Sequence, residues 1–481
     1  MISAMPQVVY DDLRINQPMA RRGWLNRKDR DDGKQRGADS FVPLPWDEAL
    51  DLLSEELDRI KLNYGNDAIF GGSYGWASAG RFHHARSLLH RFLACFGGFT
   101  QQVGNYSYGA GMAVLPHIIG SYDAIEGPLS FYSGIVSNTR LFVSFGGIPL
   151  KNAQIDAGGL GEHTTSIWLH RLREAGVDFV CISPVREEGT DFLEAEWLMP
   201  RPNTDTAIML GLAHTLVTEN LHDNNFLERY CIGFEQFLSY LLGNRDGQPK
   251  DAEWASNISG IKPEVIRDLA RRMASQRTMI NTSWSVQRCD HGEEPIWMTV
   301  ALAAILGQIG LPGGGFGFGY SSTGGMGTPR PFFSSPKHQA TPNPINRYIP
   351  VARVVDMLLQ PGQNLEFNGT TLTYPDIRLI YWAGGNPFHH HQDLNRLLKA
   401  WRKPDTIVVH ESWWTATARH ADLVLPATTT LERNDIGASR RDKYIVVMEK
   451  AIDPVGQSRD DYQIFSDLAE RLGIFDAFTE N

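Results

Sequence analysis

The sequence contains few cysteines, and none of them forms a closely spaced pair. The four thiols among the 481 residues are far apart along the chain, at Cys95, Cys181, Cys231 and Cys289. Iron–sulfur clusters and structural zinc sites use closely spaced thiolates, so this spacing predicts neither kind of centre. We expect four reduced, mostly buried thiols, as is typical of a cytoplasmic protein.

Long basic and long apolar runs are also missing. The formal net charge is -10, which argues against a nucleic-acid partner. No apolar run approaches the roughly 18 residues that cross a membrane, so we expect no membrane span. The first twelve residues, "MISAMPQVVYDD", lack the basic and then apolar order of a signal peptide.

The common nucleotide motifs are absent as well. No turn after an expected strand carries a full G-x-G-x-x-G, and G-x-x-x-x-G-K-[ST] does not occur. A simple NAD or ATP enzyme is therefore poorly supported. What is present is an ordinary globular composition, 42% hydrophobic and 21% charged, over a length that favours two or more domains.

Short apolar runs alternate with helical patterns along the chain. Runs typical of buried parallel strands lie at residues 67–75, 140–147, 177–184, 376–385, 405–412 and 422–428. Helical patterns lie at residues 46–65, 80–98, 205–220 and 295–310. This alternation predicts an α/β protein with two doubly wound α/β domains. Its turns after strands favour a large phosphorylated cofactor held between domains.

One stretch interrupts the alternation. Residues 310–348 are rich in Gly, Pro and Ser, and also contain aromatic residues, namely Phe316, Phe318, Tyr320, Phe332 and Phe333. A plain interdomain linker would explain the glycines and prolines. The aromatic residues favour an ordered loop that crosses between two domains or lines a ligand.

Four blocks identify a resemblance to a known family: "GGSYGW" (71–76), "GNYSYGAG" (104–111), "GQIGLPGGGFG" (307–317) and "HADLVLPATTTLERND" (420–435). Together they resemble the molybdopterin oxidoreductases of the dimethyl sulfoxide reductase family, nearest to the biotin sulfoxide and trimethylamine N-oxide reductase branch. The resemblance runs from residue 16 to the C-terminus. It implies the molybdopterin oxidoreductase fold, in which the family's C-terminal β-barrel domain is expected to be absent and the N-terminal segment partial.

The resemblance also implies a domain organisation. Residues 1–42 would form a partial N-terminal segment. Residues 43–148 and 349–481 would form a discontinuous α/β domain that carries the molybdenum-ligating serine. Residues 149–309 would be an inserted α/β dinucleotide-binding domain, and residues 310–348 the Gly/Pro-rich crossing loop.

The resemblance assigns the metal ligand and two catalytic side chains. In this branch a serine oxygen binds molybdenum, and the matching residue is Ser107; a hard alkoxide suits a high-valent, oxygen-binding metal. The family block here has Asn105 in place of Asp and Tyr108 in place of Thr. Tyr74, as an O–H donor, and Trp76, as an N–H donor, would be catalytic and would face the transferred oxygen. Without the resemblance, Ser107 would be a helix cap, and Tyr74 and Trp76 would be core aromatics.

The implied cofactor is bis(molybdopterin guanine dinucleotide) with molybdenum, and no iron–sulfur cluster. By resemblance its contacts are Tyr74, Gly75, Trp76, Ala77, Ser78, Lys151, Asn152, Ile182, Ser183, Asp205, Trp284, Ser285, Arg288, Asn386, His390, His410, Glu411, Arg433 and Asp461. The run His389–His391 does not predict a zinc site, because consecutive histidines of a helix point in different directions. Only His390 is assigned to the cofactor.

The implied reaction is molybdenum-dependent oxygen-atom transfer. An S-oxide or N-oxide of the biotin sulfoxide, methionine sulfoxide, dimethyl sulfoxide or trimethylamine N-oxide type would give the sulfide or amine plus water. Electrons would come from an external donor, either a protein or a reduced nicotinamide system. A second chain could supply the barrel. Cytoplasmic localisation is expected, or periplasmic if an export signal belongs before this N-terminus.

Two other functions stay open. A non-catalytic or incomplete molybdopterin-fold subunit that needs a partner chain is the alternative from a different class. A formate or nitrate enzyme with a thiol ligand is disfavoured by the serine at position 107 and by the missing cluster cysteines. Ser107, Tyr74 and Trp76 are the residues that distinguish a catalytic chain from a non-catalytic one.

Overall fold

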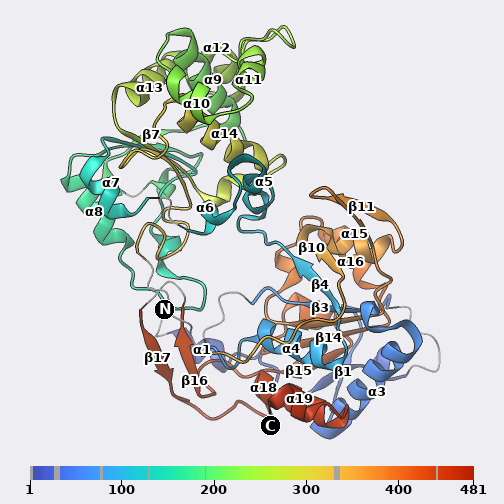
Figure 1. The fold of residues 1–481 in the computed structure, drawn as a ribbon. Coiled ribbons are helices and arrows are strands. Elements are labelled where there is room, and N and C mark those ends of the chain that lie inside the picture. The colour runs from blue at the N-terminus through green and yellow to red at the C-terminus, as the bar shows by residue number, and fades with distance from the viewer. Residues whose placement is uncertain are drawn as a thin grey trace. The chain divides into compact units, whose positions relative to one another are not determined.

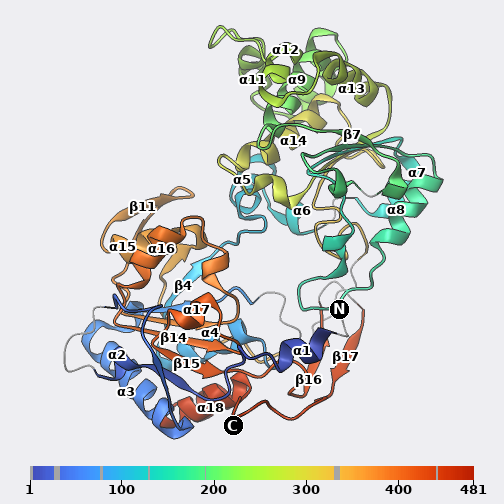
Figure 2. The same cartoon turned by 180° about the vertical axis from the view of Figure 1, so that it is seen from behind.

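The chain folds into two compact units. The computed structural model describes residues 4–26, 33–75, 80–127, 130–189, 191–329, 336–439 and 443–480. The first unit comprises Met1–Gly104, Ala157–Leu160 and Phe332–Asn481, and the second comprises Asn105–Asp156 and Gly161–Pro331 (Figures 1 and 2). Ser107 therefore belongs to the second unit, whereas the sequence grouped it with residues 43–148.

An eight-stranded sheet organises the first unit. Its order is β10-β4-β3-β13-β14-β15-β1-β2, with bounds Tyr348–Pro350, Thr100–Val103, Ile69–Gly72, Leu379–Ala383, Thr406–Glu411, Leu423–Pro426, Met19–Arg21 and Phe41–Pro43. The six strands from β10 to β15 pair in parallel. β1 and β2 add an antiparallel edge.

Both faces of this sheet are buried, because alternate residues of each strand enter different cores. In β13, Leu379, Tyr381 and Ala383 pack on one face, and Ile380 and Trp382 pack on the other. The first face is covered by α3 (Trp46–Tyr64), α4 (Ala85–Phe96), α18 (Asp461–Arg471) and α19 (Phe475–Thr479). The second is covered by α15 (Val354–Leu359), α16 (Leu394–Trp401) and α17 (Ala416–Arg419). The continuous apolar runs of the sequence are explained by this double burial.

A five-stranded parallel sheet organises the second unit. Its order is β7-β6-β5-β8-β9, with bounds Glu196–Leu198, Asp178–Ile182, Leu141–Phe145, Thr278–Thr282 and Gly315–Phe318. One core contains residues of α5 (Gly109–Ile119), α6 (Asp123–Glu126), α9 (Asp205–Thr218), α10 (Asn224–Tyr230), α11 (Phe234–Leu241), α12 (Ala252–Ser259), α13 (Pro263–Ser275) and α14 (Glu293–Ile305). The other contains residues of α7 (Tyr132–Asn138) and α8 (Thr165–Glu174).

Each parallel sheet has a point where its strand order changes direction. In the first unit, β3 leads outward to β4 and β13 leads the opposite way to β14 and β15. In the second, β5 leads to β6 and β7, whereas β8 leads to β9. Open α/β sheets bind ligands beyond the carboxyl ends of the strands at such a point. A ligand is therefore expected at the turns after β3 and β13, and after β5 and β8.

The α/β prediction is confirmed, and six expected strands and four expected helices are present at their predicted places. The Gly/Pro-rich stretch differs from the expected loop, because residues 315–318 form β9 and Phe316, Phe318 and Tyr320 are buried. Phe332 and Phe333 lie outside the described residues. The described part also contains α1 (Met5–Val9), α2 (Arg22–Leu25), and the antiparallel pairs β11/β12 (Asn364–Phe367, Thr370–Thr373) and β16/β17 (Asp435–Ala438, Ile445–Met448). None of the helices described is both long and apolar enough to cross a membrane.

Candidate functional site

Two glycines shape the turn after β13 in the first unit. Gly384 and Gly385 both have a φ of 81°, which favours glycine. A Cβ on Gly385 would lie 2.6 Å from the Cβ of Tyr74, which follows β3. The backbone N–H of Tyr74 also donates to the carbonyl of Gly384 at 2.8 Å. The adjacent carboxyl ends of β3 and β13 are thus joined directly.

Tyr74 is held by aromatic and imidazole groups. Its ring lies edge-on to Trp382 at 4.8 Å and packs on His390 at 4.6 Å. Its hydroxyl is 3.2 Å from Nε2 of His391. Burial is the main cause that lowers the pKa of His391 to about 4, so this imidazole is neutral at pH 7. Tyr74 therefore has a fixed ring and a hydroxyl bonded to an uncharged partner.

The segment that follows Tyr74 is anchored again at its far end. The carboxylate of Asp435 accepts the backbone N–H groups of Arg81 and Phe82 at 2.9 Å, and that of His83 at 3.2 Å. Gly75 is described, and its N–H donates to the hydroxyl of Ser73 at 3.2 Å. The predicted residues Trp76, Ala77 and Ser78 lie outside the described residues.

A buried chain of polar groups ends at Asp461. Nδ1 of His410 is 2.8 Å from Oδ1 of Asp461, and Nε2 is 2.9 Å from the hydroxyl of Tyr381. Glu411, the next residue of β14, accepts the N–H of Ser412 and the hydroxyl of Thr415 at 2.8 and 3.1 Å. Burial raises the pKa of Glu411. Three predicted residues of the first unit are thus gathered where β14 ends and α18 begins.

Two more predicted residues keep donors open. Oδ1 of Asn386 accepts the N–H of Phe388 and the hydroxyl of Thr417, and no bond of its Nδ2 to a described residue is found. Nη1 of Arg433 donates to the carbonyl of Thr428 at 2.7 Å, but its buried Nε has no partner among the described residues. Buried polar groups are normally hydrogen-bonded, so the buried Nε of Arg433 fits an anionic or acceptor-rich ligand, and the half-buried Asn386 has a donor available for the same kind of group.

In the second unit, one glutamine holds the turn that contains Ser107. Oε1 of Gln287, which follows β8, accepts the N–H of Ala110 at 2.7 Å. Its Nε2 donates to the carbonyl of Ser107 at 3.0 Å and to that of Tyr106 at 3.4 Å. Arg288 adds a bond from Nε to the Ser107 carbonyl at 3.3 Å. The backbone of the turn is therefore held by the side chains of Gln287 and Arg288.

Ser107 does not cap the following helix. The N-cap of α5 is Tyr108, without a side-chain cap, and the N–H of Tyr108 donates to Oδ1 of Asn105 at 2.8 Å. Asn105 supplies the acceptor that an Asp would supply at this place. Among the described residues, no hydrogen bond uses the half-buried Ser107 hydroxyl. The alternative interpretation of Ser107, as the cap of the following helix, therefore does not hold.

The remaining predicted residues of the second unit follow its strands but differ in exposure. Ile182 ends β6, and the hydroxyl of the buried Ser183 accepts the N–H of Val185 at 3.3 Å. Lys151 and Asn152 lie after β5 and are exposed, with Lys151 paired to Glu188. After β8, the Ser285 hydroxyl is 3.1 Å from that of Ser283, and Trp284 donates its indole N–H to the carbonyl of Ile125 at 3.1 Å.

Asp205 is the first residue of α9, and no other described residue forms a hydrogen bond or ion pair with its side chain. Burial is the largest cause that raises the pKa of its carboxyl to about 6. A largely desolvated carboxylate at the start of a helix can accept N–H or O–H donors of a ligand. This position therefore fits the predicted contact.

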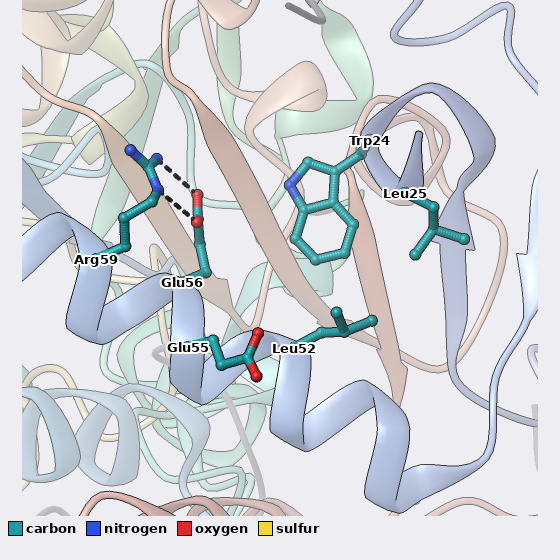
Figure 3. A pocket seen from close by; sticks show the side chains of 6 residues that line it. All are labelled: Trp24, Leu25, Leu52, Glu55, Glu56 and Arg59. Carbon is teal, nitrogen blue, oxygen red and sulfur yellow. Dashed lines mark hydrogen bonds and ion pairs between the residues drawn. The ribbon is translucent and has the colours of Figure 1, made fainter. Parts of the chain in front are cut away.

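A cavity of about 360 Å³ lies elsewhere in the first unit (Figure 3). It is lined by Trp24, Leu25, Leu52, Glu55, Glu56 and Arg59, and Nε of Arg59 donates to Glu56 at 2.8 Å. The indole N–H of Trp24 donates to the hydroxyl of Thr406 at 2.9 Å. Because Thr406 begins β14, the cavity lies at the amino ends of the strands, opposite to the predicted cofactor residues.

Comparison with protein-family models decides the family. The model described as "Molybdopterin oxidoreductase" matches residues 14–471. The chain belongs to the molybdopterin oxidoreductase family. Enzymes of this family use a molybdenum–molybdopterin cofactor, and the residues described above fit such a group.

Several curated relatives are similar to the whole chain. The "Biotin sulfoxide reductase" of Cereibacter sphaeroides is 47% identical and aligns with 100% of this chain and 64% of its own length. The "Dimethyl sulfoxide/trimethylamine N-oxide reductase" of the same organism is 47% identical over 98% of this chain and 59% of its own length. The "Trimethylamine-N-oxide reductase" of Haemophilus influenzae is 42% identical over 98% and 58%. The chain thus spans less than two thirds of the length of these relatives.

A solved structure shares the fold. "Acetylene Hydratase from Pelobacter acetylenicus" superposes with a TM-score of 0.63 over 99% of this chain and 64% of its own, at 19% identity. At that identity the likeness concerns the fold alone.

Sequence reasoning missed residues that support the predicted ones. Gln287, Tyr381, His391 and Asp435 all hold a predicted residue or its segment through the bonds described above. His391 lies next to the predicted His390, and Gln287 lies next to the predicted Arg288, so both were adjacent to predicted residues. Asp435 is the last residue of the block at 420–435, whereas Tyr381 carried no such signal, because a tyrosine in a strand is common. No group of three or more His, Cys, Asp or Glu that could hold a metal occurs in the described part, including His389–His391.

Proposed function

We propose that this chain binds bis(molybdopterin guanine dinucleotide) and forms the catalytic part of an S-oxide or N-oxide reductase. Similarity to reductases named for biotin sulfoxide, dimethyl sulfoxide and trimethylamine N-oxide supports this reaction class. One observation carries the proposal. The turn around Ser107 is held at several backbone atoms, whereas no described residue uses its hydroxyl.

Such a turn is suited to present one oxygen ligand. Because Gln287 and Arg288 hold the backbone, the Ser107 hydroxyl needs little reorganisation to bind a metal. A serine alkoxide is a hard ligand, which suits high-valent molybdenum. When bound, the cofactor supplies the two-electron redox chemistry of oxygen-atom transfer.

Tyr74 would orient the substrate's oxygen. Its hydroxyl can donate to an S–O or N–O oxygen, and its packing on Trp382 and His390 fixes the direction of that bond. The neutral His391 holds the same hydroxyl without placing a positive charge beside it. We propose the same donor role for Trp76.

The other predicted residues would bind the cofactor's polar parts. In the first unit, Nδ2 of Asn386 and Nε of Arg433 are open donors that suit phosphate or carbonyl oxygens. In the second, Lys151 suits a pyrophosphate charge, and Asp205 suits the N–H or O–H groups of a nucleoside. An external electron donor, a second chain and a cytoplasmic location are part of the same proposal. The alternative is an incomplete subunit that needs a partner chain for activity.

Molybdenum content of the purified chain tests the proposal. We expect molybdenum in the wild type, and loss or redox inactivity of the metal in Ser107→Ala. Ser137→Ala is the matched control, because Ser137 is an exposed serine of α7 in the same unit. It should retain the metal. Equal, redox-active molybdenum in Ser107→Ala would contradict the ligand assignment, and no molybdenum in any variant would contradict cofactor binding by this chain.

A further inference from the structure

His410 joins one strand to the start of one helix within the first core of the first unit. Tyr381 and His410 lie on the neighbouring strands β13 and β14, with their rings 5.3 Å apart. Phe465 of α18 stacks on the His410 ring at 4.7 Å. Tyr381 is 0% exposed, His410 4% and Asp461 5%. The chain Tyr381–His410–Asp461 is therefore removed from water and packed on one side.

The burial of Tyr381 decides the direction of its hydrogen bonds. Its hydroxyl proton needs an acceptor, and the described residues offer only Nε2 of His410, at 2.9 Å. Nε2 accepting from Tyr381 leaves the imidazole proton on Nδ1. Nδ1–H then donates to Oδ1 of Asp461 at 2.8 Å. Each donor among these three side chains then has an acceptor, and the hydrogen bonds are donated in the direction from Tyr381 through His410 to Asp461.

This arrangement uses both ring nitrogens of His410. A ring nitrogen has one in-plane hydrogen-bonding position, so His410 has none left for a ligand. Asp461 differs, because His410 engages only Oδ1 and no bond to Oδ2 from the described residues is found. Asp461 is the first residue of α18, at the carboxyl end of β14. A carboxylate only accepts hydrogen bonds, so its ligand group must carry N–H or O–H donors.

We propose that Tyr381 and His410 are positioning residues that orient Asp461 toward the N–H edge of the cofactor's guanine base. This inference rests on the proposed function. His410 supports Asp461 instead of contacting the cofactor itself, and Tyr381 fixes the imidazole tautomer that makes this support possible. Partners that orient a binding group in this way contribute about 10- to 100-fold to affinity at metal sites. A similar effect is expected here.

Histidine tautomers provide the first test, independent of any ligand. Nitrogen-15 NMR of histidine-labelled full-length chain should show His410, assigned by its absence in His410→Gln, as a neutral ring protonated on Nδ1 at pH 7. Tyr381→Phe removes the hydroxyl and should change this signal. Tyr320→Phe is the matched control, because Tyr320 is a buried tyrosine of the second unit that donates to the carbonyl of Ser130 at 2.6 Å. A ring protonated on Nε2 or on both nitrogens in the wild type would overturn the proposal.

Nucleotide binding provides the second test, with GDP and IDP as probes. GDP carries the exocyclic amine that IDP lacks, so wild type should prefer GDP by about tenfold, which corresponds to one good hydrogen bond at a desolvated site. Tyr381→Phe should weaken GDP binding about tenfold and reduce this preference, and Asp461→Asn should weaken it at least as much. The double variant should be no weaker than Asp461→Asn alone, because Tyr381 acts through Asp461.

The outcomes separate this inference from the function on which it rests. Tight GDP binding that is unchanged in Tyr381→Phe would overturn the positioning role and leave the proposed function intact. Additive losses in the double variant would also overturn it, since Tyr381 would then act independently of Asp461. A wild type that binds neither molybdenum nor GDP would overturn both.

Discussion

The two sheets each have a point where the strand order changes direction, but their carboxyl edges are built differently at that point. In the first unit, side chains hold one another, as in the pairs Tyr74–His391 and His410–Asp461. In the second unit, a side chain holds the backbone, as Gln287 holds the turn around Ser107. The first arrangement fixes the direction of several functional groups, whereas the second fixes one turn and leaves its hydroxyl open. Similar topology thus permits two ways of preorganising a site.

The largest loss of stability is expected from filling the space between the turn after β13 and the turn after β3 in the first unit. Gly385→Ala would place a Cβ 2.6 Å from the Cβ of Tyr74, in a backbone with a φ of 81°. We expect a loss of about 3–4 kcal/mol in the free energy of unfolding of the first unit, measured by urea denaturation. Tyr74 would also be displaced from His391.

Gly362→Ala is the control for this change. Gly362 has nearly the same φ, 83°, and a Cβ there would meet nothing within 4 Å. Only the backbone preference should be lost, at about 1 kcal/mol. Equal losses in the two variants would show that contact with Tyr74 does not stabilise the edge.

A smaller loss of stability is expected from removing the side chain that holds the turn around Ser107 in the second unit. Gln287→Leu removes three hydrogen bonds and leaves the N–H of Ala110 without its acceptor, which should cost about 2–3 kcal/mol of the free energy of unfolding. If the turn presents the metal ligand, molybdenum content should fall with it. Metal analysis and urea denaturation measure the two effects.

Gln308→Leu separates stability from metal binding. Gln308 is a buried glutamine of the same unit whose amide also bonds three backbone groups, those of Thr278, Gln276 and Met273. It should lose similar stability and keep its molybdenum. If both variants lose metal equally, general destabilisation and not the Ser107 turn explains the loss.

The smallest of these effects concerns pH. The pKa of Asp205 is about 6 in the folded chain, above the ordinary 3.8, so the folded state binds this proton more tightly than the unfolded state. The stability contributed by the proton is present below the unfolded pKa and is lost as pH rises through 6; between pH 4 and pH 6 the loss is about 2 kcal/mol. Asp205→Asn should remove this pH dependence and raise the free energy of unfolding at pH 7.5.

Asp290→Asn is the control, because the Asp290 side chain is 89% exposed in the same unit. It should leave the pH dependence unchanged. A wild-type profile that does not fall between pH 4 and 6, in urea denaturation at a series of pH values, would show that Asp205 is ordinarily hydrated. The second edge would then lack the desolvated carboxylate that we describe.

Much of the fold could be predicted because its strands are buried on both faces. The apolar runs at residues 376–385 and 405–412 mark β13 and β14 clearly. β4 and β8 were missed, since "TQQV" and "TMINT" contain polar residues that are buried only through their partners. β9 was missed because its glycines resemble a loop, although Phe316 and Phe318 are buried.

The sequence by itself determined the α/β class, the family blocks and the residue types at the site, because these depend on local pattern and on resemblance. Only the tertiary structure decided how those residues are supported. Tyr381 and Asp461 are 80 positions apart along the sequence, yet both bond His410. Gln287 reaches Ser107 across 180 positions. Hydrogen bonds depend on distance in space and on burial, and no local pattern specifies which distant partner satisfies a buried donor.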